Sequence, residues 1–384
     1  MHLGILTGGG DVPGLNAAIK AVVNEADRHG WRVTAFRRGW AGPVNTDPTD
    51  PSATAETHWS LSPDRVRAVD RSGGTFIHTS RTNPSRMMPD DIPAHVQVDR
   101  TPNAEGRVDI TAHVLKVLEA MQIDVLVAIG GDDTLSYAAR IHTEGARTMC
   151  IPKTMDNDVF GTDYCIGFST CVTRSVDMIN NLRTSAGSHE RHMVVEMFGR
   201  NCGLTALAAG YLADADRALI AEVPFDLEHL AQLLAKDRDH KDSRYTITVV
   251  SEGASIIGED IIQSGEEDAY GHRKLGGIGE RIGEGLKQLT GTNIMNQKLG
   301  YLLRSGGPDA VDLIVGKNYG TMCVQLIEEG QSGLMMAIRD GCYTTQPADI
   351  STKGLHRVDV DNLYDVEQYR PKIARVKGIP MYLR

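Results

Sequence analysis

Two adjacent aspartates follow an apolar run at residues 124–129. The run continues into Gly130-Gly131-Asp132-Asp133-Thr134, and a helical pattern comes next. In an open α/β sheet, ligands bind at the carboxyl ends of the strands, so this turn is expected at a binding crevice. A carboxylate there can hold Mg²⁺ together with the phosphate oxygens of a substrate, which makes Asp132 the metal candidate. The alternative is an aspartate that only caps the following helix.

A second acidic turn follows the next apolar run, Thr148–Ile151. Its sequence is Pro-Lys-Thr-Met-Asp-Asn-Asp, so that Lys153, Asp156 and Asp158 can all reach the same crevice. A hydroxyl that attacks a phosphorus atom needs a carboxylate base and cations on the phosphoryl oxygens. Asp156 is the candidate base and Lys153 a candidate phosphate contact. The alternative is a polar turn whose aspartates bond to backbone amides while the lysine points into solvent.

A glycine-rich turn, Gly8–Gly14, joins a short apolar strand at Leu3–Thr7 to a helical pattern over 14–29. Glycines let the backbone approach an anion, and the N-terminus of a helix attracts it. The turn therefore suits a phosphate, although the same glycines could simply make a tight turn. The sequence contains no G-x-x-x-x-G-K-[ST] motif, which excludes an ordinary P-loop.

Four arginines lie in or next to glycine- and serine-rich segments: Arg81, Arg191, Arg200 and Arg304. A guanidinium group in such a place can bind phosphate oxygens bidentately. Each of them, taken singly, could equally be a solvated surface arginine.

The elements that must position these residues alternate between strands and helices. Further strands are expected at His192–Met197, Arg217–Ala221 and Tyr245–Ser251, and helices near 169–186, 202–213 and 226–238. Repeated alternation of this kind predicts an α/β fold with mostly parallel sheets and helices on both faces. Residues 41–64 and 258–280 are expected to be long surface loops.

Length and composition narrow the class of protein. The 384 residues fit two domains. A net charge of −10 argues against a nucleic-acid or membrane-surface binder, since those need a basic face. The six cysteines show neither a CxxC pair nor a Cys/His metal spacing, as in a cytoplasmic protein with reduced thiols, and no apolar stretch approaches 18 residues.

Taken together, the motifs resemble the phosphofructokinase family. The matching segments are Gly8–Gly14 with Asn16, Gly130–Thr134, Pro152–Asp158, Glu196–Arg200 and Leu299–Gly307. They occur in the family's order over most of the chain. The resemblance implies two Rossmann-like three-layer domains. It also implies Mg²⁺-dependent, reversible transfer of a phosphoryl group to the 1-hydroxyl of fructose 6-phosphate, which would serve both glycolysis and gluconeogenesis.

On the donor side, the resemblance implies that the Gly10 amide and Arg81 contact the donor phosphates and that Asp132 holds Mg²⁺. Members of the family that use ATP have glycine where this chain has Asp133 and Lys153, and members with Asp and Lys there resemble users of pyrophosphate. A carboxylate at Asp133 would repel an α-phosphate, and Lys153 could neutralise the phosphate left behind. Pyrophosphate is the expected donor and ATP the alternative.

On the acceptor side, the resemblance implies that Asp156 takes the proton from the sugar hydroxyl, flanked by Thr154 and Asp158. The residues expected to bind the sugar phosphate are Phe198, Gly199, Arg200, Glu252, Tyr301 and Arg304. Arg191 resembles an arginine that reaches the site of a neighbouring subunit, which implies a homodimer or homotetramer.

Three positions depart from the family pattern around the sugar phosphate. Phe198 replaces the usual methionine of a Met-Gly-Arg motif, Tyr301 replaces a histidine, and Met295 stands where an arginine is usual, with Lys298 as its substitute. Sedoheptulose 7-phosphate is therefore a second candidate acceptor beside fructose 6-phosphate.

The expected domains follow the two roles. Residues 1–138 and about 251–300 are expected to form the donor domain, and 139–250 with about 301–347 the sugar-phosphate domain. Residues 348–384 form an extension beyond the resemblance, which could cap the second domain or an interface. A regulatory subunit without catalysis remains an alternative, but such a subunit has no evident need of Arg81, Asp132, Asp156 and Asp158.

Overall fold

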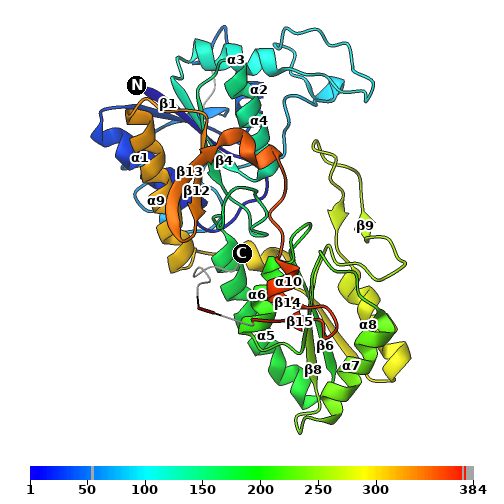
Figure 1. Cartoon of the computed structure of the whole chain (residues 1–384). Helices are drawn as coiled ribbons and strands as arrows, with labels where there is room; N and C mark the ends of the chain where they lie inside the picture. Colours follow the sequence, from blue (N-terminus) through cyan, green and yellow to red (C-terminus); the bar gives the residue numbers. More distant parts are fainter. Residues whose placement is uncertain (53–55, 374–375, 378–384) are drawn as a thin grey trace.

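The computed structural model of the chain describes residues 1–52, 56–373 and 376–377. Two sheets form its two halves, the larger in the upper half of Figure 1 and the smaller in the lower half. The larger has seven strands in the order β13-β12-β5-β4-β1-β2-β3, and the smaller has four in the order β11-β6-β8-β7. The predicted α/β class with mostly parallel sheets is confirmed.

The large sheet is parallel in its centre and antiparallel at both edges. Its strands are β1 (His2–Thr7), β2 (Arg32–Phe36), β3 (His58–Leu61), β4 (Val125–Gly130), β5 (Thr148–Pro152), β12 (Leu334–Arg339) and β13 (Cys342–Pro347). β3 and β13 are the antiparallel edge strands. Every residue of β1, β4 and β5 is buried, as expected of parallel strands that helices cover on both faces.

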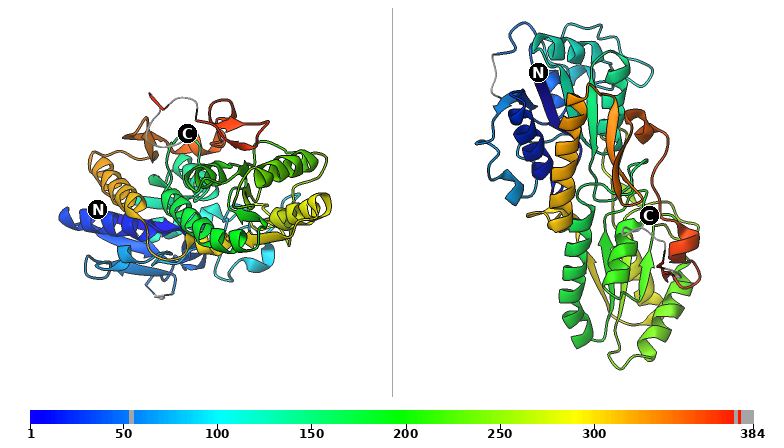
Figure 2. Two further views of the ribbon diagram at one scale, coloured as in Figure 1. Left: turned by 90° about the horizontal axis from the view of Figure 1, so that it is seen from below. Right: turned by 60° about the vertical axis from the view of Figure 1, so that its left-hand side comes forward.

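Helices α1 (Leu15–Arg28) and α9 (Ala310–Glu328) lie side by side along one face of this sheet (Figures 1 and 2). They approach closely because α9 presents glycines to α1: a Cβ on Gly320 would lie 2.6 Å from the carbonyl oxygen of Ala18. The remaining helices of this half are α2 (Ala41–Asn45), α3 (Thr111–Ala120) and α4 (Asp132–Thr143).

The small sheet is parallel throughout. Its strands are β6 (His192–Met197), β7 (Arg217–Leu219), β8 (Thr246–Ser251) and β11 (Ile294–Lys298). The helices of this half are α5 (Phe168–Ser188), α6 (Leu204–Leu212), α7 (Leu227–Asp239) and α8 (Ile278–Thr290). The small elements elsewhere are β9 (Gln263–Ser264), β10 (Lys274–Leu275), α10 (Val360–Leu363), β14 (Tyr364–Asp365), β15 (Arg370–Pro371) and the 3₁₀ turns at Val69–Arg71, Pro89–Asp91, Gly300–Arg304 and Ala348–Thr352.

The sheets divide the chain differently from the domain boundaries expected from sequence. β5, β12 and β13 pair within the large sheet, although the expected boundaries assign them to the sugar-phosphate half, and β11 pairs with β6 in the small sheet rather than in the donor half. Strand pairing is a long-range property that the order of motifs along the chain does not reveal.

Two of the expected loops contain regular structure. Residues 41–64 include α2 and β3, so the interpretation as a plain loop was wrong there, and positions 53–55 lie outside the described residues. Residues 258–277 are irregular apart from the β9–β10 pair, and α8 begins at Ile278.

The extension packs across both halves. The 3₁₀ turn at Ala348–Thr352 lies against α4, while β15 lies against α6 and β7. The Tyr364 hydroxyl donates to the carbonyl of Ala218 (2.7 Å) and the Ala218 amide to the carbonyl of Tyr369 (2.8 Å). The part of the extension that the structure describes therefore covers the edge of the small sheet, and 374–375 and 378–384 lie outside it.

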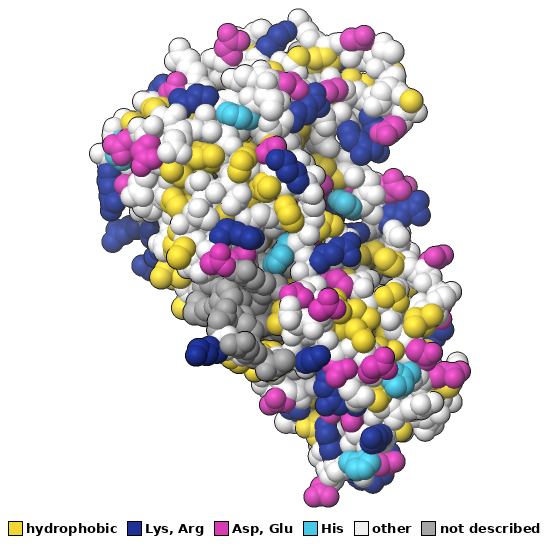
Figure 3. Space-filling model, viewed as in Figure 1, with side chains coloured by type: hydrophobic (Ala, Val, Ile, Leu, Met, Phe, Trp, Pro, Cys, Tyr) yellow, Lys and Arg dark blue, Asp and Glu magenta, His cyan; other side chains and the backbone are white. Residues whose placement is uncertain are grey.

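Acidic and basic side chains are interspersed over the face shown in Figure 3. All six cysteines are free, and only Cys342 is exposed. No helix in the described ranges is long and apolar enough to span a membrane.

Candidate active site

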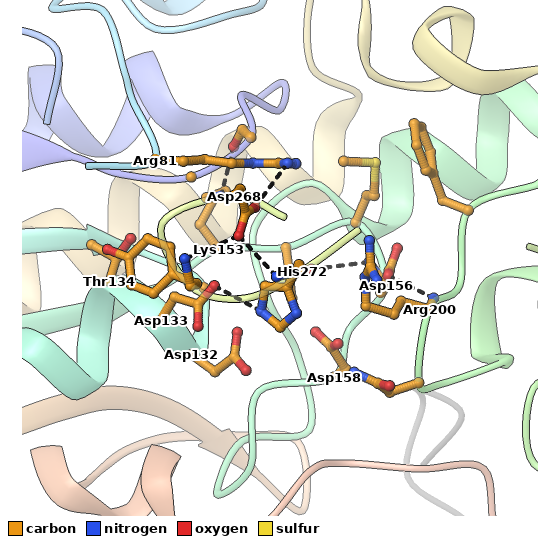
Figure 4. A pocket seen from close by; sticks show the side chains of 18 of the residues that line it. Arg81, Asp132, Asp133, Thr134, Lys153, Asp156, Asp158, Arg200, Asp268 and His272 are labelled. Atoms are coloured by element: carbon orange, nitrogen blue, oxygen red, sulfur yellow. Dashed lines mark hydrogen bonds and ion pairs between the residues drawn. The ribbon is translucent and has the colours of Figure 1, made fainter. Parts of the chain in front are cut away.

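A polar cavity of about 180 Å³ lies where the carboxyl ends of strands from the two sheets face each other (Figure 4). We call it the inner cavity. The sequence-predicted residues that line it are Gly10, Arg81, Asp132, Asp133, Lys153, Thr154, Asp156, Asp158, Phe198, Arg200, Glu252 and Arg304. The turns after β1, β4 and β5 thus meet at one place, as expected for parallel neighbours in a sheet.

The first glycine turn owes its shape to close contacts. The Gly8 amide donates to the carbonyl of Ile129 (2.9 Å), and a Cβ on Gly8 would lie 2.3 Å from Oγ1 of Thr134. A Cβ on Gly10 would lie 2.7 Å from a guanidinium nitrogen of Arg304. A side chain at Gly8 would collide with Thr134, whereas the atom beside Gly10 is the end of a flexible arginine that can move; glycine at both positions leaves the backbone itself as the wall of the cavity.

The adjacent aspartates occupy the first turn of α4. The N-cap residue is Gly131, which makes no side-chain cap bond, so Asp132 is not the capping residue that the alternative interpretation required. Burial and the neighbouring Asp133 raise the pKa of Asp132. Asp133 is itself paired, since its Oδ2 lies 3.2 Å from Nε2 of His272.

Lys153 is buried and does not point into solvent. Its ammonium group donates to the carbonyl of Gly10 over 2.6 Å, and only 4% of the residue is exposed. Burial, followed by the nearby Arg304 guanidinium, lowers its pKa to about 8. A buried cation of this kind faces the cavity directly and is available to an anion placed there.

Asp158 is buried and Asp156 is half-buried in the turn after β5. The Asp156 carboxylate accepts the backbone N–H of Arg200 (3.1 Å). Burial and Glu252 raise the pKa of Asp156, and burial and Asp156 raise that of Asp158. A carboxyl whose pKa is raised towards neutrality is suited to accept a proton in catalysis.

The loop that carries these two aspartates is fixed by Asn157, whose φ is +55°. Asn157 accepts the Cys165 amide (2.7 Å) and donates to the carbonyl of Asp163 (3.0 Å). The extension adds a third support. The ring Nδ1 of His356 bonds to the Asn157 carbonyl (2.7 Å), and its backbone amide donates to the carbonyl of Asp158 (2.9 Å).

The carboxylates suit a divalent cation that the substrate also helps to hold. Repulsion from Asp132 contributes to the raised pKa of both Asp156 and Asp158, and Asp133 contributes to that of Asp132; a cation would relieve this repulsion. No group of three or more metal-ligating side chains with the geometry of a complete site occurs among the described residues. This combination fits Mg²⁺, which is commonly held by one or two carboxylates plus substrate phosphates.

A second cavity of about 680 Å³, which we call the outer cavity, adjoins the first and shares Arg81, Phe198, Arg200, Glu252 and Arg304 with it. Tyr301 and Lys298 also line it. The Arg304 guanidinium stacks on the Tyr301 ring at 4.5 Å from its centroid and lies 3.5 Å from the carboxylate of Asp11.

Contacts of residues next to the outer cavity fix the position of the side chains that line it. Gly199 has φ +136°, and a Cβ there would lie 2.0 Å from Oγ of Ser251, so the turn that presents Arg200 needs glycine. The Lys298 ammonium is held by the buried Glu196 at 2.8 Å. Burial raises the pKa of Glu252.

Arg191 is the one predicted residue that lies away from both cavities. It precedes β6, whose opposite end leads to Arg200, and six strand residues separate the two by about 20 Å.

The structure also brings residues to the inner cavity that the sequence did not single out. Asp268, Tyr270 and His272 come from the stretch expected to be a surface loop. Asp268 lies 3.2 Å from the Arg81 guanidinium, and the Tyr270 hydroxyl donates to the carbonyl of Thr82 (3.0 Å). No periodicity or motif marks these residues, since their partners are distant in sequence.

Comparison with known proteins agrees with this geometry. A family model described as Phosphofructokinase matches residues 2–327. The chain is 37% identical over 341 residues to a pyrophosphate–fructose 6-phosphate 1-phosphotransferase of Amycolatopsis methanolica, which covers 88% of this chain and 91% of the relative. It is 36% identical over 357 residues to an ATP-dependent 6-phosphofructokinase of Chloroflexus aggregans, with 93% and 92% covered.

Solved structures show the same fold. Pichia pastoris phosphofructokinase in the T-state superposes with a TM-score of 0.74 at 25% identity, covering 92% of this chain and 35% of that chain. A pyrophosphate-dependent phosphofructokinase from Marinobacter aquaeolei superposes with a TM-score of 0.73 at 17% identity, covering 100% and 98%.

Proposed function

Because the chain belongs to the phosphofructokinase family, we propose that it transfers a phosphoryl group from pyrophosphate to the 1-hydroxyl of fructose 6-phosphate. The products are fructose 1,6-bisphosphate and phosphate. The inner cavity takes the pyrophosphate and the reacting hydroxyl, and the outer cavity takes the rest of the sugar phosphate.

The observation that carries the choice of donor is the buried ammonium group of Lys153. Its 2.6 Å bond to the Gly10 carbonyl holds it at the donor loop, where it can neutralise the phosphate that leaves. Asp133 lines the same cavity, so the additional phosphate and the nucleoside of ATP would lie against its carboxylate. Attraction for a short diphosphate and repulsion of a longer chain act in the same direction.

The reacting groups are arranged for in-line transfer. The Asp156 carboxylate, held by the Arg200 amide, accepts the proton of the sugar hydroxyl. Thr154 and Asp158 flank the phosphoryl group during transfer, and Arg81 and the Gly10 amide bind the donor phosphates. Mg²⁺, held by Asp132 and the donor, supplies charge neutralisation on the phosphoryl oxygens.

Positive charge in the outer cavity suits the phosphate of the sugar. Arg200, Lys298 and Arg304 line it, and Glu252 is placed to accept hydrogen bonds from sugar hydroxyls. Lys298 supplies the positive charge for the sugar phosphate that an arginine at the position of Met295 supplies in the family pattern. An outer cavity of about 680 Å³ also leaves room for the longer sedoheptulose 7-phosphate as a second acceptor.

Arg191 fits a role in a homo-oligomer. It lies at the end of β6 remote from the cavities of its own chain, so it can act on a phosphate only in a neighbouring subunit. We place it there by the family resemblance.

The rival donor is ATP, which the similarity to the Chloroflexus aggregans relative favours. Initial rates with purified protein, Mg²⁺ and fructose 6-phosphate, measured with pyrophosphate and with ATP at matched concentrations, distinguish the two. Turnover with pyrophosphate alone is the expected result. Turnover with ATP alone would overturn the argument from Lys153 and Asp133, and no turnover with either donor would favour a regulatory subunit.

A further inference from the structure

Residues 268–275, which we call the bridging segment, line both cavities. Asp268, Tyr270 and His272 line the inner cavity, and Lys274 and Leu275 line the outer one. The segment belongs to the connection between β8 and α8 of the small-sheet half. Figure 1 shows this connection, marked by β9, extending from the lower half towards the upper half.

The donor side of the bridging segment is attached to the large-sheet half at three points. Asp268 pairs with Arg81 (3.2 Å), the Tyr270 hydroxyl donates to the carbonyl of Thr82 (3.0 Å), and His272 pairs with Asp133 (3.2 Å). Figure 4 shows Asp268 and His272 over the cavity, between the donor residues and Asp156. The Arg81 guanidinium and the His272 ring each bond to a carboxylate, at places where donor phosphate oxygens could accept the same hydrogen bonds.

Its acceptor side is attached to the sugar-phosphate residues. The Arg200 guanidinium donates to the carbonyl of Arg273 (2.8 Å), and Lys274 faces the same cavity as Lys298 and Arg304. An anion in the outer cavity therefore contacts this side of the segment directly.

The donor side of the segment is a compact turn. One carboxylate oxygen of Asp268 accepts the amides of Tyr270 and His272, both at 3.0 Å, and the Asp268 amide donates to the carbonyl of His272 (2.9 Å). These bonds fix residues 268–272 as one turn, and Arg273 alone separates His272 from Lys274, so a shift of the turn also shifts Lys274.

We propose that the bridging segment is a substrate-binding element shared by the two subsites, in which His272 donates a hydrogen bond to a donor phosphate and Lys274 binds the phosphate of the sugar. A ligand that bonds to the segment in one cavity holds it in place for the other cavity and thereby strengthens binding there. The coupling is reciprocal, since both ligands favour the same closed arrangement. This inference rests on the proposed function for the identity of the two ligands.

Calorimetric titration with fructose 6-phosphate, in the presence and absence of Mg²⁺ and methylenediphosphonate, measures the coupling without turnover. The diphosphonate is a non-hydrolysable analogue of pyrophosphate. In the wild-type protein we expect it to tighten sugar-phosphate binding at least about fivefold, within the usual range of coupling between sites. Tyr270→Phe removes only the hydroxyl bond to Thr82 and should reduce this factor towards one.

Two further variants assign the ligands to residues. His272→Ala should weaken diphosphonate binding about tenfold and Lys274→Ala should weaken sugar-phosphate binding about tenfold, as for loss of one charge-assisted hydrogen bond. Lys287→Ala, on the exposed side of α8, is the matched control and should change neither.

The outcomes separate this inference from the proposed function. Unchanged affinities in the His272 and Lys274 variants, or no coupling in the wild-type protein, would overturn the shared element even if the enzyme turns over with pyrophosphate. Coupling in the calorimeter combined with turnover only with ATP would retain the shared element and refute pyrophosphate as the donor.

Discussion

Replacement of Asp156 by asparagine should abolish most turnover while it stabilises the protein. Asparagine has the same shape, and its carbonyl oxygen can keep the 3.1 Å bond from the Arg200 amide, so the loop should keep its conformation. Only the ability to accept a proton is lost. A positioned base contributes about 10²–10⁴-fold, so the activation barrier should rise by about 3–5 kcal/mol.

The gain in stability follows from the raised pKa of Asp156. Burial and Glu252 disfavour the ionised carboxyl in the folded protein, and each pKa unit corresponds to about 1.4 kcal/mol. The folded pKa lies above the unfolded value of 3.8, so the wild-type protein loses stability relative to the variant as the pH rises from that value through the raised pKa. At pH 8 we expect Asp156→Asn to be more stable by about 1–3 kcal/mol, and at pH 4 the difference should be small.

Two measurements test this prediction together. Initial rates give the loss of turnover, and urea unfolding followed by circular dichroism at pH 4 and pH 8, with EDTA present, gives the difference in the free energy of unfolding. Asp177→Asn, on the exposed side of α5, is the control and should change neither quantity. A variant that keeps turnover within a few-fold of wild type would refute Asp156 as the base, and one that is less stable at pH 8 would refute the raised pKa.

Three further changes should have distinct effects. Lys153→Met removes the buried ammonium at the Gly10 carbonyl and should lower kcat/KM for pyrophosphate at least about tenfold. The KM for fructose 6-phosphate should change little. Initial rates at varied concentrations of both substrates measure the two effects. Asp132→Asn should raise the Mg²⁺ concentration that gives half the maximal rate about tenfold or more, measured by Mg²⁺ titration after EDTA treatment. An unchanged midpoint would exclude Asp132 as the metal ligand. His356→Ala removes the ring bond to the Asn157 carbonyl and should lower kcat about tenfold with KM nearly constant. His356→Asn can still donate this bond and should restore most of kcat. An equal loss of kcat in both variants would argue against positioning through this bond.

The sequence by itself indicated the fold class and most of the inner cavity. The reason is local: each turn that carries chemistry directly follows a buried strand, and the carboxyl ends of neighbouring parallel strands meet at one edge of a sheet. The glycine turn at Gly8–Gly14 and the aspartates after β4 and β5 therefore had to lie close together. The resemblance then supplied the roles, including those of Arg200 and Arg304.

Local alternatives could be decided only in three dimensions. The sequence allowed Lys153 to point into solvent and Asp132 to cap a helix, and the structure instead buries the lysine against Gly10 and places Gly131 at the cap position. Whether a polar side chain is buried depends on what packs over it, which comes from distant parts of the chain.

The tertiary structure alone revealed the bridging segment and the support from the extension. His272 and Asp133 are 139 residues apart, Asp268 and Arg81 are 187 apart, and His356 lies 199 residues from Asn157. Contacts over such separations leave no periodicity in the sequence, because neither partner needs a regular neighbour pattern to make them. For the same reason the order of motifs did not show that β11 joins the small sheet and that β5, β12 and β13 join the large one. Thus the sequence by itself determined which polar residues follow the strands, because local patterns fix where each strand ends. Only the packing of the two halves decided which irregular segments contact those residues.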